Sequence, residues 1–297
     1  MGSKHRLKCK ACGCAHRDLG PKQERCPRCD ALIGPRERIE KKKRPSPRNP
    51  DARELHSLLD DAVLIDAFGE RFEAALLALA ASPLPLCLDA EGVALSRTGA
   101  LTLLQLAAES CCFLFDVQTL GAACFGRGGA GHTLRSLLED PLRLKCCWDV
   151  RRDSDALLHQ FNVAVAGVLD TQLLAVALRR ASGATVTRLP GLSQSAAAHL
   201  PPGLLAGAAA LKSAIADCYS DTPAFWAQRP LSQNALRYAA ADAVLTRRLH
   251  VALLEAAEPA LLARVQAASD NRVREWRDAA EAVPQRQCAE DRVAPLF

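Results

Sequence analysis

Two acidic residues, Asp89 and Glu91, lie two positions apart inside the apolar run 86–92. Side chains alternate faces along a strand, so residues i and i+2 would project both carboxylates from one side of a sheet. Like charges this close repel each other, and such clusters persist where a hard divalent cation such as Mg²⁺ or Mn²⁺ lies between them. For an isolated Asp-x-Glu, the alternative is a strand end whose acids face water.

Later in the chain, two further groups of residues are capable of chemistry. Asp153 lies at the start of a predicted helix that follows a predicted strand, and Asp149 and Asp155 are its neighbouring alternatives. Tyr238 and Asp242 are four positions apart in an alanine-rich predicted helix, so the phenol and the carboxylate share one face. A core tyrosine hydrogen-bonded to its neighbour is the alternative for this pair.

The elements that must position these residues follow from hydrophobic periodicity. Short connections between the predicted strands 86–92, 101–107 and 111–117 favour an antiparallel meander. Strands and helices then alternate, which predicts parallel additions and a mixed sheet covered by helices. The remaining expected elements are strands at 62–66, 142–148 and 165–169, helices at 70–80, 133–138 and 153–161, a helix capped by Asp170 and Thr171, a mobile glycine-rich loop at 126–131, a loop at 190–202 and a long amphipathic stretch at 236–280.

The first segment, residues 1–34, has a cysteine pattern of its own. Two Cys-x-x-Cys pairs separated by thirteen residues present four thiolates to one tetrahedral Zn²⁺, and so short and polar a segment has no other means of ordering itself. The predicted ligands are Cys9, Cys12, Cys26 and Cys29, with Cys14 and His16 as spare candidates. The segment resembles a zinc ribbon, and a flexible basic tail with chance cysteines is the alternative.

Residues 35–50 have the composition of a solvated, disordered linker, rich in proline and charge. Residues 1–50 hold 15 Lys or Arg against 5 Asp or Glu, so the positive charge of the chain is concentrated there. The run 41–44 is typical of a nuclear import signal, of an arm that contacts phosphates, or of a plain tether. The predicted domains that follow are 51–260, and a C-terminal helix and tail at 261–297.

Composition excludes several classes of protein. With 49% hydrophobic and 24% charged residues, the 297-residue chain is ordinary for a globular protein. The apolar runs are too short for a membrane span, and residues 1–6 lack the apolar core of a secretory signal. Eight of the 13 cysteines follow residue 29, most of them in apolar runs, which is typical of a reduced compartment. We therefore expect a nuclear or cytoplasmic protein that is not secreted and does not bind membranes.

The order and spacing of the motifs resemble one family over residues 62–254. This stretch is similar to the 3′-to-5′ exonuclease domain of the DEDDy group in the ribonuclease H-like (DnaQ-like) superfamily, in its ribonuclease D, Werner-type and Egalitarian-like branches. The matching segments are Leu-Asp-Ala-Glu-Gly (88–92), Phe-Asp-Val-Gln-Thr-Leu-Gly (115–121), Asp-Ser-Asp-Ala-Leu-Leu-His-Gln-Phe (153–161), Asp-Thr-Gln (170–172), Trp-Ala-Gln-Arg-Pro (226–230) and Tyr-Ala-Ala-Ala-Asp (238–242). The resemblance implies an α/β, ribonuclease H-like fold with a mixed sheet of five or six strands flanked by helices.

The resemblance also implies roles for single residues. Asp89, Glu91, Asp153 and Asp242 would hold two Mg²⁺ or Mn²⁺ ions, and Tyr238 would position the attacking water. Asp153 is preferred to its neighbours because it matches the motif and opens the helix. One departure is Trp148, which stands where the family often has histidine, and Asp170 is expected to support the pocket and not to bind the metals.

The function implied is hydrolysis of phosphodiester bonds from the 3′ end of RNA or DNA, releasing nucleoside 5′-monophosphates. Two other classes of function stay open: a nucleic-acid-binding module of the same fold that has lost catalysis, and an adaptor whose ribbon and helices recruit proteins. Metal-dependent loss of the terminal nucleotide would distinguish the enzyme from both.

Overall fold

The chain divides into two compact units, residues 1–46 and 47–297. A computed structural model describes residues 7–8, 15–16, 59, 62–83, 85–109, 111–129, 131–221, 224–283 and 294–295. In the first unit, β1 (Leu7–Lys8) pairs antiparallel with β2 (Ala15–His16). The four predicted zinc ligands and the predicted linker lie outside the described residues, so the zinc ribbon stays a prediction.

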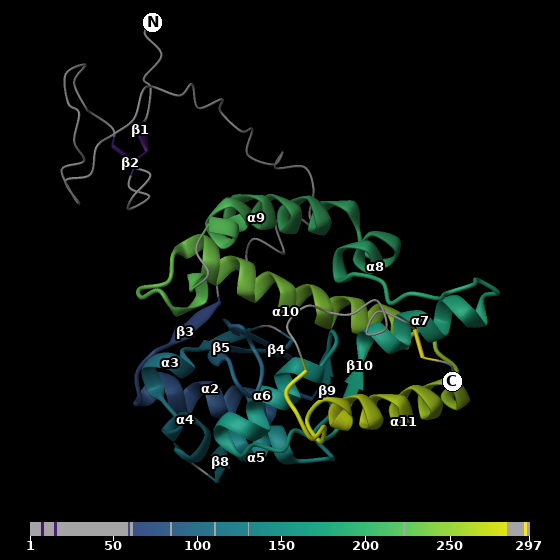
Figure 1. Ribbon diagram of the computed structural model, residues 1–297, viewed down its shortest axis with the longest axis horizontal. Coiled ribbons are helices and arrows are strands. Elements are labelled where there is room, and N and C mark those ends of the chain that lie inside the picture. The colour runs from purple at the N-terminus through teal and green to yellow at the C-terminus, as the bar shows by residue number, and fades with distance from the viewer. Residues whose placement is uncertain are drawn as a thin grey trace, which may run out of the picture. The chain divides into compact units, whose positions relative to one another are not determined.

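A six-stranded mixed sheet forms the centre of the second unit (Figure 1). Its order is β10 (Val168–Asp170), β9 (Lys145–Cys147), β4 (Leu86–Val93), β5 (Ala100–Ala107), β6 (Cys112–Phe115) and β3 (Val63–Ile65). The strands β4, β5 and β6 form an antiparallel meander, whereas β9, β10 and β3 join through parallel pairs. The predicted mixed sheet is confirmed, and β3 supplies the sixth strand.

Helices cover both faces of this sheet. One face packs against α2 (Glu70–Ala81), α5 (Leu134–Glu139) and α6 (Arg151–Phe161). The other packs against α7 (Thr171–Ala181) and α10 (Gln233–Leu254), and α8 (Leu192–His199) and α9 (Pro202–Asp221) pack in turn on α10. Helix α11 (Pro259–Glu275) runs along β10 at the edge of the sheet (Figure 1). The short helices are α3 (Val117–Leu120), α4 (Ala123–Gly126) and the 3₁₀ turn η1 (Phe225–Ala227).

The alternation of β4 decides which side carries the acids. Leu86, Leu88 and Ala90 are buried in the core with α2, whereas Cys87 is buried in the core with α10. Asp89 is two positions after Cys87 and therefore points to the same face of the sheet, so its carboxylate faces the side of α10.

Three predicted segments differ from the structure. The glycine-rich stretch predicted as a loop contains half of a hairpin, because β7 (Gly128–Gly129) pairs with β8 (His132–Thr133). A Cβ on Gly128 would lie 1.9 Å from the carbonyl oxygen of His132, so glycine permits this close approach. The predicted loop at 190–202 contains α8, and the predicted stretch 236–280 is two helices separated before Pro259, which opens α11.

Among the described helices, none combines the length and apolar character needed to cross a membrane.

Candidate active site

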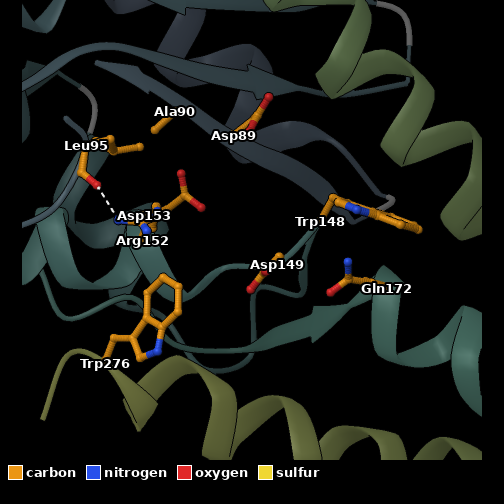
Figure 2. Close-up of a pocket in the computed structure, with 9 residues that line it drawn as sticks. All are labelled: Asp89, Ala90, Leu95, Trp148, Asp149, Arg152, Asp153, Gln172 and Trp276. Carbon is orange, nitrogen blue, oxygen red and sulfur yellow. Dashed lines mark hydrogen bonds between the residues drawn. The ribbon is translucent and has the colours of Figure 1, made fainter. Parts of the chain in front are cut away.

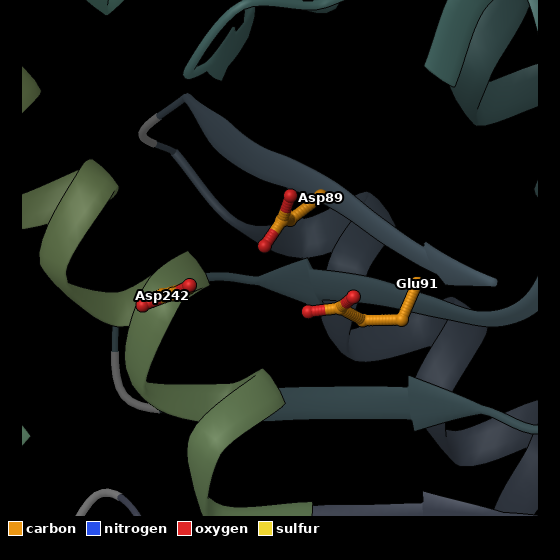
Figure 3. Close-up of side chains that lie close together, drawn as sticks. All are labelled: Asp89, Glu91 and Asp242. Atoms are coloured by element: carbon orange, nitrogen blue, oxygen red, sulfur yellow. The ribbon is translucent and has the colours of Figure 1, made fainter. Parts of the chain in front are cut away.

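Strand β4 presents Asp89 and Glu91 on the face that α10 covers (Figure 3). The pairing of β4 with β5 shifts its register between Glu91 and Gly92, a bulge beside the acids after which the pairing continues to Val93. A Cβ on Gly92 would lie 1.9 Å from the carbonyl oxygen of Ala100, so a side chain at this position would force the two strands apart. The bulge and the close approach at Gly92 therefore lie directly beside Glu91, which stays within β4.

Helix α10 brings the third acid, Asp242, to the same place. The helix begins after Ser232, whose side chain accepts a hydrogen bond from the backbone N–H of Ala235. Buried alanines line α10 and let its backbone approach the sheet: Ala235, Ala239, Ala240, Ala241 and Ala243. Carboxylate oxygens of Asp89, Glu91 and Asp242 consequently lie within 4.8 Å of one another (Figure 3).

Asp153 reaches the site from the first turn of α6. It is buried, and it lines one cavity of about 320 Å³ together with Asp89 (Figure 2). It is not part of the tight group of three acids, but its charge contributes to the raised pKa of Glu91, and the charge of Asp89 contributes to its own. The structure thus places Asp153 and Asp89 on the wall of the same cavity.

The two alternatives to Asp153 are both held by arginines. Asp149 accepts hydrogen bonds from Arg151 at 2.7 and 2.8 Å, and Asp155 accepts from the backbone and side chain of Arg97 at 2.6 and 2.8 Å. Their charges are already balanced by these ion pairs, which leaves Asp153 as the acid of this segment that is available to a cation.

The electrostatics of the site reflect unbalanced negative charge. Burial and the neighbouring charge of Asp242 raise the pKa of Asp89 to about 8. Burial, with the charges of Asp89 and Asp242, raises the pKa of Glu91 well above its usual range, and burial and Asp89 do the same for Asp153. Like charges in a desolvated site shift pKa values in this direction. A bound cation would reverse the shift, because it favours the ionised form of every acid.

The donor set fits a hard divalent cation. All the converging groups are carboxylates, the oxygen ligands that Mg²⁺ and Mn²⁺ prefer. The 4.8 Å limit on their oxygens is close to the separation of about 3–4 Å between ligands that share one Mg²⁺. The residues present therefore suit the cations that the sequence motifs imply.

Comparison with known proteins shows the family to which the chain belongs. A family model described as 3′-5′ exonuclease matches residues 69–258. The chain belongs to the 3′-5′ exonuclease domain family. The similar curated proteins include piRNA biogenesis protein EXD1 of Mus musculus and of Homo sapiens, each 31% identical over 196 residues. The match covers 65% of this chain but 33% and 36% of those proteins, so the chain spans about a third of their length.

Solved structures of Trypanosoma brucei RNase D have the same architecture as this exonuclease domain. The complex of that protein with GMP has a TM-score of 0.63 and 25% identity, covering 80% of this chain and 71% of its own. A second crystal structure of the same protein has a TM-score of 0.61 and 25% identity, covering 80% of each chain. The ribonuclease H-like fold implied by the motifs is thereby confirmed.

Within the exonuclease domain, Tyr238 lies one turn before Asp242 on α10, and each of the two side chains shifts the pKa of the other. The phenol and the positive charge of Lys212 lower the pKa of Asp242, but burial outweighs both and the net shift is upward. Burial and the charge of Asp242 raise the pKa of Tyr238 above its ordinary value. In the metal-free site the phenol is therefore protonated at neutral pH and acts as a hydrogen-bond donor.

The Trp-Ala-Gln-Arg-Pro segment before α10 positions this tyrosine. The ring centroids of Trp226 and Tyr238 are 6.2 Å apart. Arg229 donates two hydrogen bonds of 2.7 Å to the buried Asp116, which follows β6. The segment is thus clamped to the sheet, and its tryptophan packs against the ring that must stay in place.

The cavity beside Asp89 has a wall to which the motifs contribute only in part. Trp148, Gln172 and Trp276 line it with Asp149 and Arg152 (Figure 2). Trp276, the residue that follows α11, packs against the guanidinium groups of Arg151 and Arg152, which lie 4.4 and 4.8 Å from its ring centroid. Sequence reasoning missed Trp276 because residues 261–297 were predicted to be a separate helix and tail.

Asp170 also has a defined environment. It accepts hydrogen bonds from the backbone N–H groups of Asp149 and Val150 at 3.3 Å and from Arg272 at 3.1 Å. As the first residue before α7, it also caps Gln172 at 2.9 Å. Its fixed position holds the strand end from which α6 and Asp153 begin, while its charge is balanced by Arg272.

Proposed function

We propose that this chain is a 3′-5′ exonuclease that removes nucleoside 5′-monophosphates one at a time from a free 3′ end. The observation that carries the proposal is the convergence of the oxygens of Asp89, Glu91 and Asp242 within 4.8 Å, with Asp153 and Asp89 on the wall of one cavity. Membership of the 3′-5′ exonuclease family supports the reaction class.

The four acids have the role of holding two divalent cations, Mg²⁺ or Mn²⁺. When bound, such a pair lowers the pKa of a water molecule and stabilises the leaving 3′-oxygen. Asp89 belongs to the group of three and also lines the cavity with Asp153, so it would help to hold both cations. Removal of Asp89 should therefore be the most damaging single change.

Tyr238 has the role of orienting the attacking water. Its phenol lies one turn before Asp242 on α10, and it would orient the water and help remove its proton as the water attacks. Trp226 and the clamp between Arg229 and Asp116 hold the ring in that orientation. Such positioning is worth about 10²–10⁴ in rate for a group that acts on a proton in the reaction.

RNA is the substrate that the relatives favour. The curated relatives are named for piRNA biogenesis, and the T. brucei RNase D structure holds GMP, a nucleoside monophosphate of the kind expected as product. The basic residues 1–50 would supply phosphate contacts that the acidic remainder of the chain lacks. A ribose-specific contact is the feature that would separate RNA from DNA.

The test uses the full chain and single-stranded RNA and DNA of one sequence, each labelled at the 3′ terminus. Mg²⁺ or Mn²⁺ should release the labelled mononucleotide, EDTA should stop the release, and circular RNA should stay intact because it has no 3′ end. Asp89→Asn should lower the rate at least about 100-fold, whereas Glu258→Gln, an exposed acid between α10 and α11, should not change it. Binding of the oligonucleotide without metal-dependent release would refute the proposal.

A further inference from the structure

Gln105 is a polar residue in the buried centre of the sheet. Its side chain has 0% exposure, and neither its amide nitrogen nor its amide oxygen has a hydrogen-bond partner in the described part of the chain. On the same face of β5, its neighbours two positions away are Leu103 and Ala107, both buried in the core with α10. Buried amides are nearly always hydrogen-bonded, so an unpaired one in a native core requires an explanation.

Strand register places this amide beside the acidic cluster. Gln105 is directly opposite Asp89 in the antiparallel pair of β4 and β5. Directly opposed residues point to the same face, with Cβ atoms about 4.5–5.5 Å apart. The register also brings Cys87 and Glu91 of β4 and Leu114 of β6 next to Gln105 on this face. Among these strand neighbours, Asp89 and Glu91 carry oxygens that can accept a hydrogen bond. Asp89 is directly opposite Gln105, whereas Glu91 is opposite Leu103, so Asp89 is the nearer acceptor.

We propose that Gln105 is a positioning residue for Asp89, its Nε2–H donating to a carboxylate oxygen of Asp89, directly or through one water, when the site holds its cations. The inference rests on the proposed function, because it assigns Asp89 to a metal. An apolar side chain would fill the same space in the core, so burial alone does not explain the amide. Partners that orient a metal ligand by hydrogen bonding set its geometry, and their loss weakens metal affinity about 10–100-fold.

Binding of Mn²⁺ without substrate tests the proposal directly. Mn²⁺ suits carboxylate sites and is titrated into the full chain by calorimetry, with the free ion followed by electron paramagnetic resonance. The variant Gln105→Met keeps the length and approximate volume of the side chain but removes both polar atoms. Its matched control is Leu114→Met, a volume-conserving change at the buried position directly opposite on β6. Asp89→Asn identifies the binding event that belongs to the acidic site.

The expected result is Mn²⁺ binding weakened about tenfold in Gln105→Met, with Leu114→Met within about twofold of wild type. The thermal midpoint of Gln105→Met in EDTA should equal or exceed that of wild type, because an unpaired buried amide is lost. Wild-type Mn²⁺ affinity in Gln105→Met would overturn the proposal, as would a weakening accompanied by a midpoint below that of Leu114→Met. If wild type and Asp89→Asn bind Mn²⁺ equally, the proposed function fails first and the role of Gln105 fails with it.

Discussion

Replacing Asp89 with Asn should stabilise the metal-free protein at alkaline pH while removing its response to metal. Burial and Asp242 raise the pKa of the Asp89 carboxyl from 3.8 to about 8. A carboxyl whose pKa is raised on folding contributes stability below its unfolded value, and this contribution is lost as the pH rises through its folded value. For Asp89 the loss extends from about pH 4 to about pH 8, and an amide, which does not ionise, avoids it.

The size of the effect has an upper bound. Each pKa unit corresponds to about 1.4 kcal/mol, so ionised Asp89 destabilises the metal-free fold above pH 8 by at most about 6 kcal/mol. The repulsion is shared among Asp89, Glu91 and Asp242, and the two remaining acids readjust when one charge is removed. We therefore expect a gain below the upper bound, about 1–3 kcal/mol of added stability in Asp89→Asn. In a domain of this size each kcal/mol raises the thermal midpoint by about 2–4 °C.

The difference in stability is measured by denaturing both proteins at a series of pH values from about 5 to about 9, first in EDTA and then in Mn²⁺. In EDTA the variant should be more stable at the alkaline end and nearly equal at the acidic end. Mn²⁺ at about a hundred times its dissociation constant should add about 2.7 kcal/mol to wild type and much less to the variant, so the order reverses.

Asp155→Asn is the matched control, because it is the same Asp-to-Asn change at another acid of the domain, in helix α6. Asp155 is buried and paired with Arg97, so its neutralisation should destabilise the protein by about 3–5 kcal/mol in EDTA and in Mn²⁺ alike. If Asp89→Asn behaves like this control at the alkaline end, the Asp89 site is not electrostatically strained and the reasoning is refuted.

Three other perturbations have defined outcomes. Tyr238→Phe should lower the cleavage rate about 10²–10⁴-fold with Mn²⁺ affinity preserved, and a calorimetric titration that shows lost affinity would contradict a role limited to the water. Arg97→Ala should destabilise the protein by about 3–5 kcal/mol, because Arg97 joins Asp155 to the carbonyl oxygens of Trp276 and Ala279. Urea denaturation measures this loss, and an unchanged free energy of unfolding would contradict it. Deleting residues 1–50 should weaken RNA binding and flatten its salt dependence while cleavage of short oligonucleotides at high concentration survives, and equal affinities of both chains across a salt series would contradict it.

The sequence predicts parts of the site that depend on local periodicity. Asp89 and Glu91 share a face because strands repeat every two residues, and Tyr238 and Asp242 share one because helices repeat every 3.6. The approach of α10 to β4 is a tertiary contact between segments about 150 positions apart, and periodicity alone does not contain it. The family resemblance predicted that these segments lie together. In the structure, the buried alanines of α10 allow its backbone to approach the sheet.

Local departures from the predicted elements have equally local causes. Helix α6 begins at Arg151, so Asp153 lies inside its first turn and does not cap it. Helix α8 lies in a segment whose flanking prolines and glycine predicted a loop, but its buried Ala196 packs with the α10 core. Gln105 offered only a weak signal, a single amide in an apolar strand, and its significance depends on strand register.

Ion pairing separates the structural acids of this domain from those that converge. Buried or partly buried aspartates outside the site each have an arginine: Asp116 with Arg229, Asp149 with Arg151, Asp155 with Arg97 and Asp170 with Arg272. In the part of the chain that the structure describes, no ion pair involves the four acids Asp89, Glu91, Asp153 and Asp242, although three of them lie within 4.8 Å. This fold supplies arginines to its other acids and leaves these four without one, so it retains a local excess of negative charge. Excess charge on groups that are at least half-buried is destabilising unless a cation binds. The unpaired state of these acids is thus an argument for a metal that is independent of the motif in which they occur.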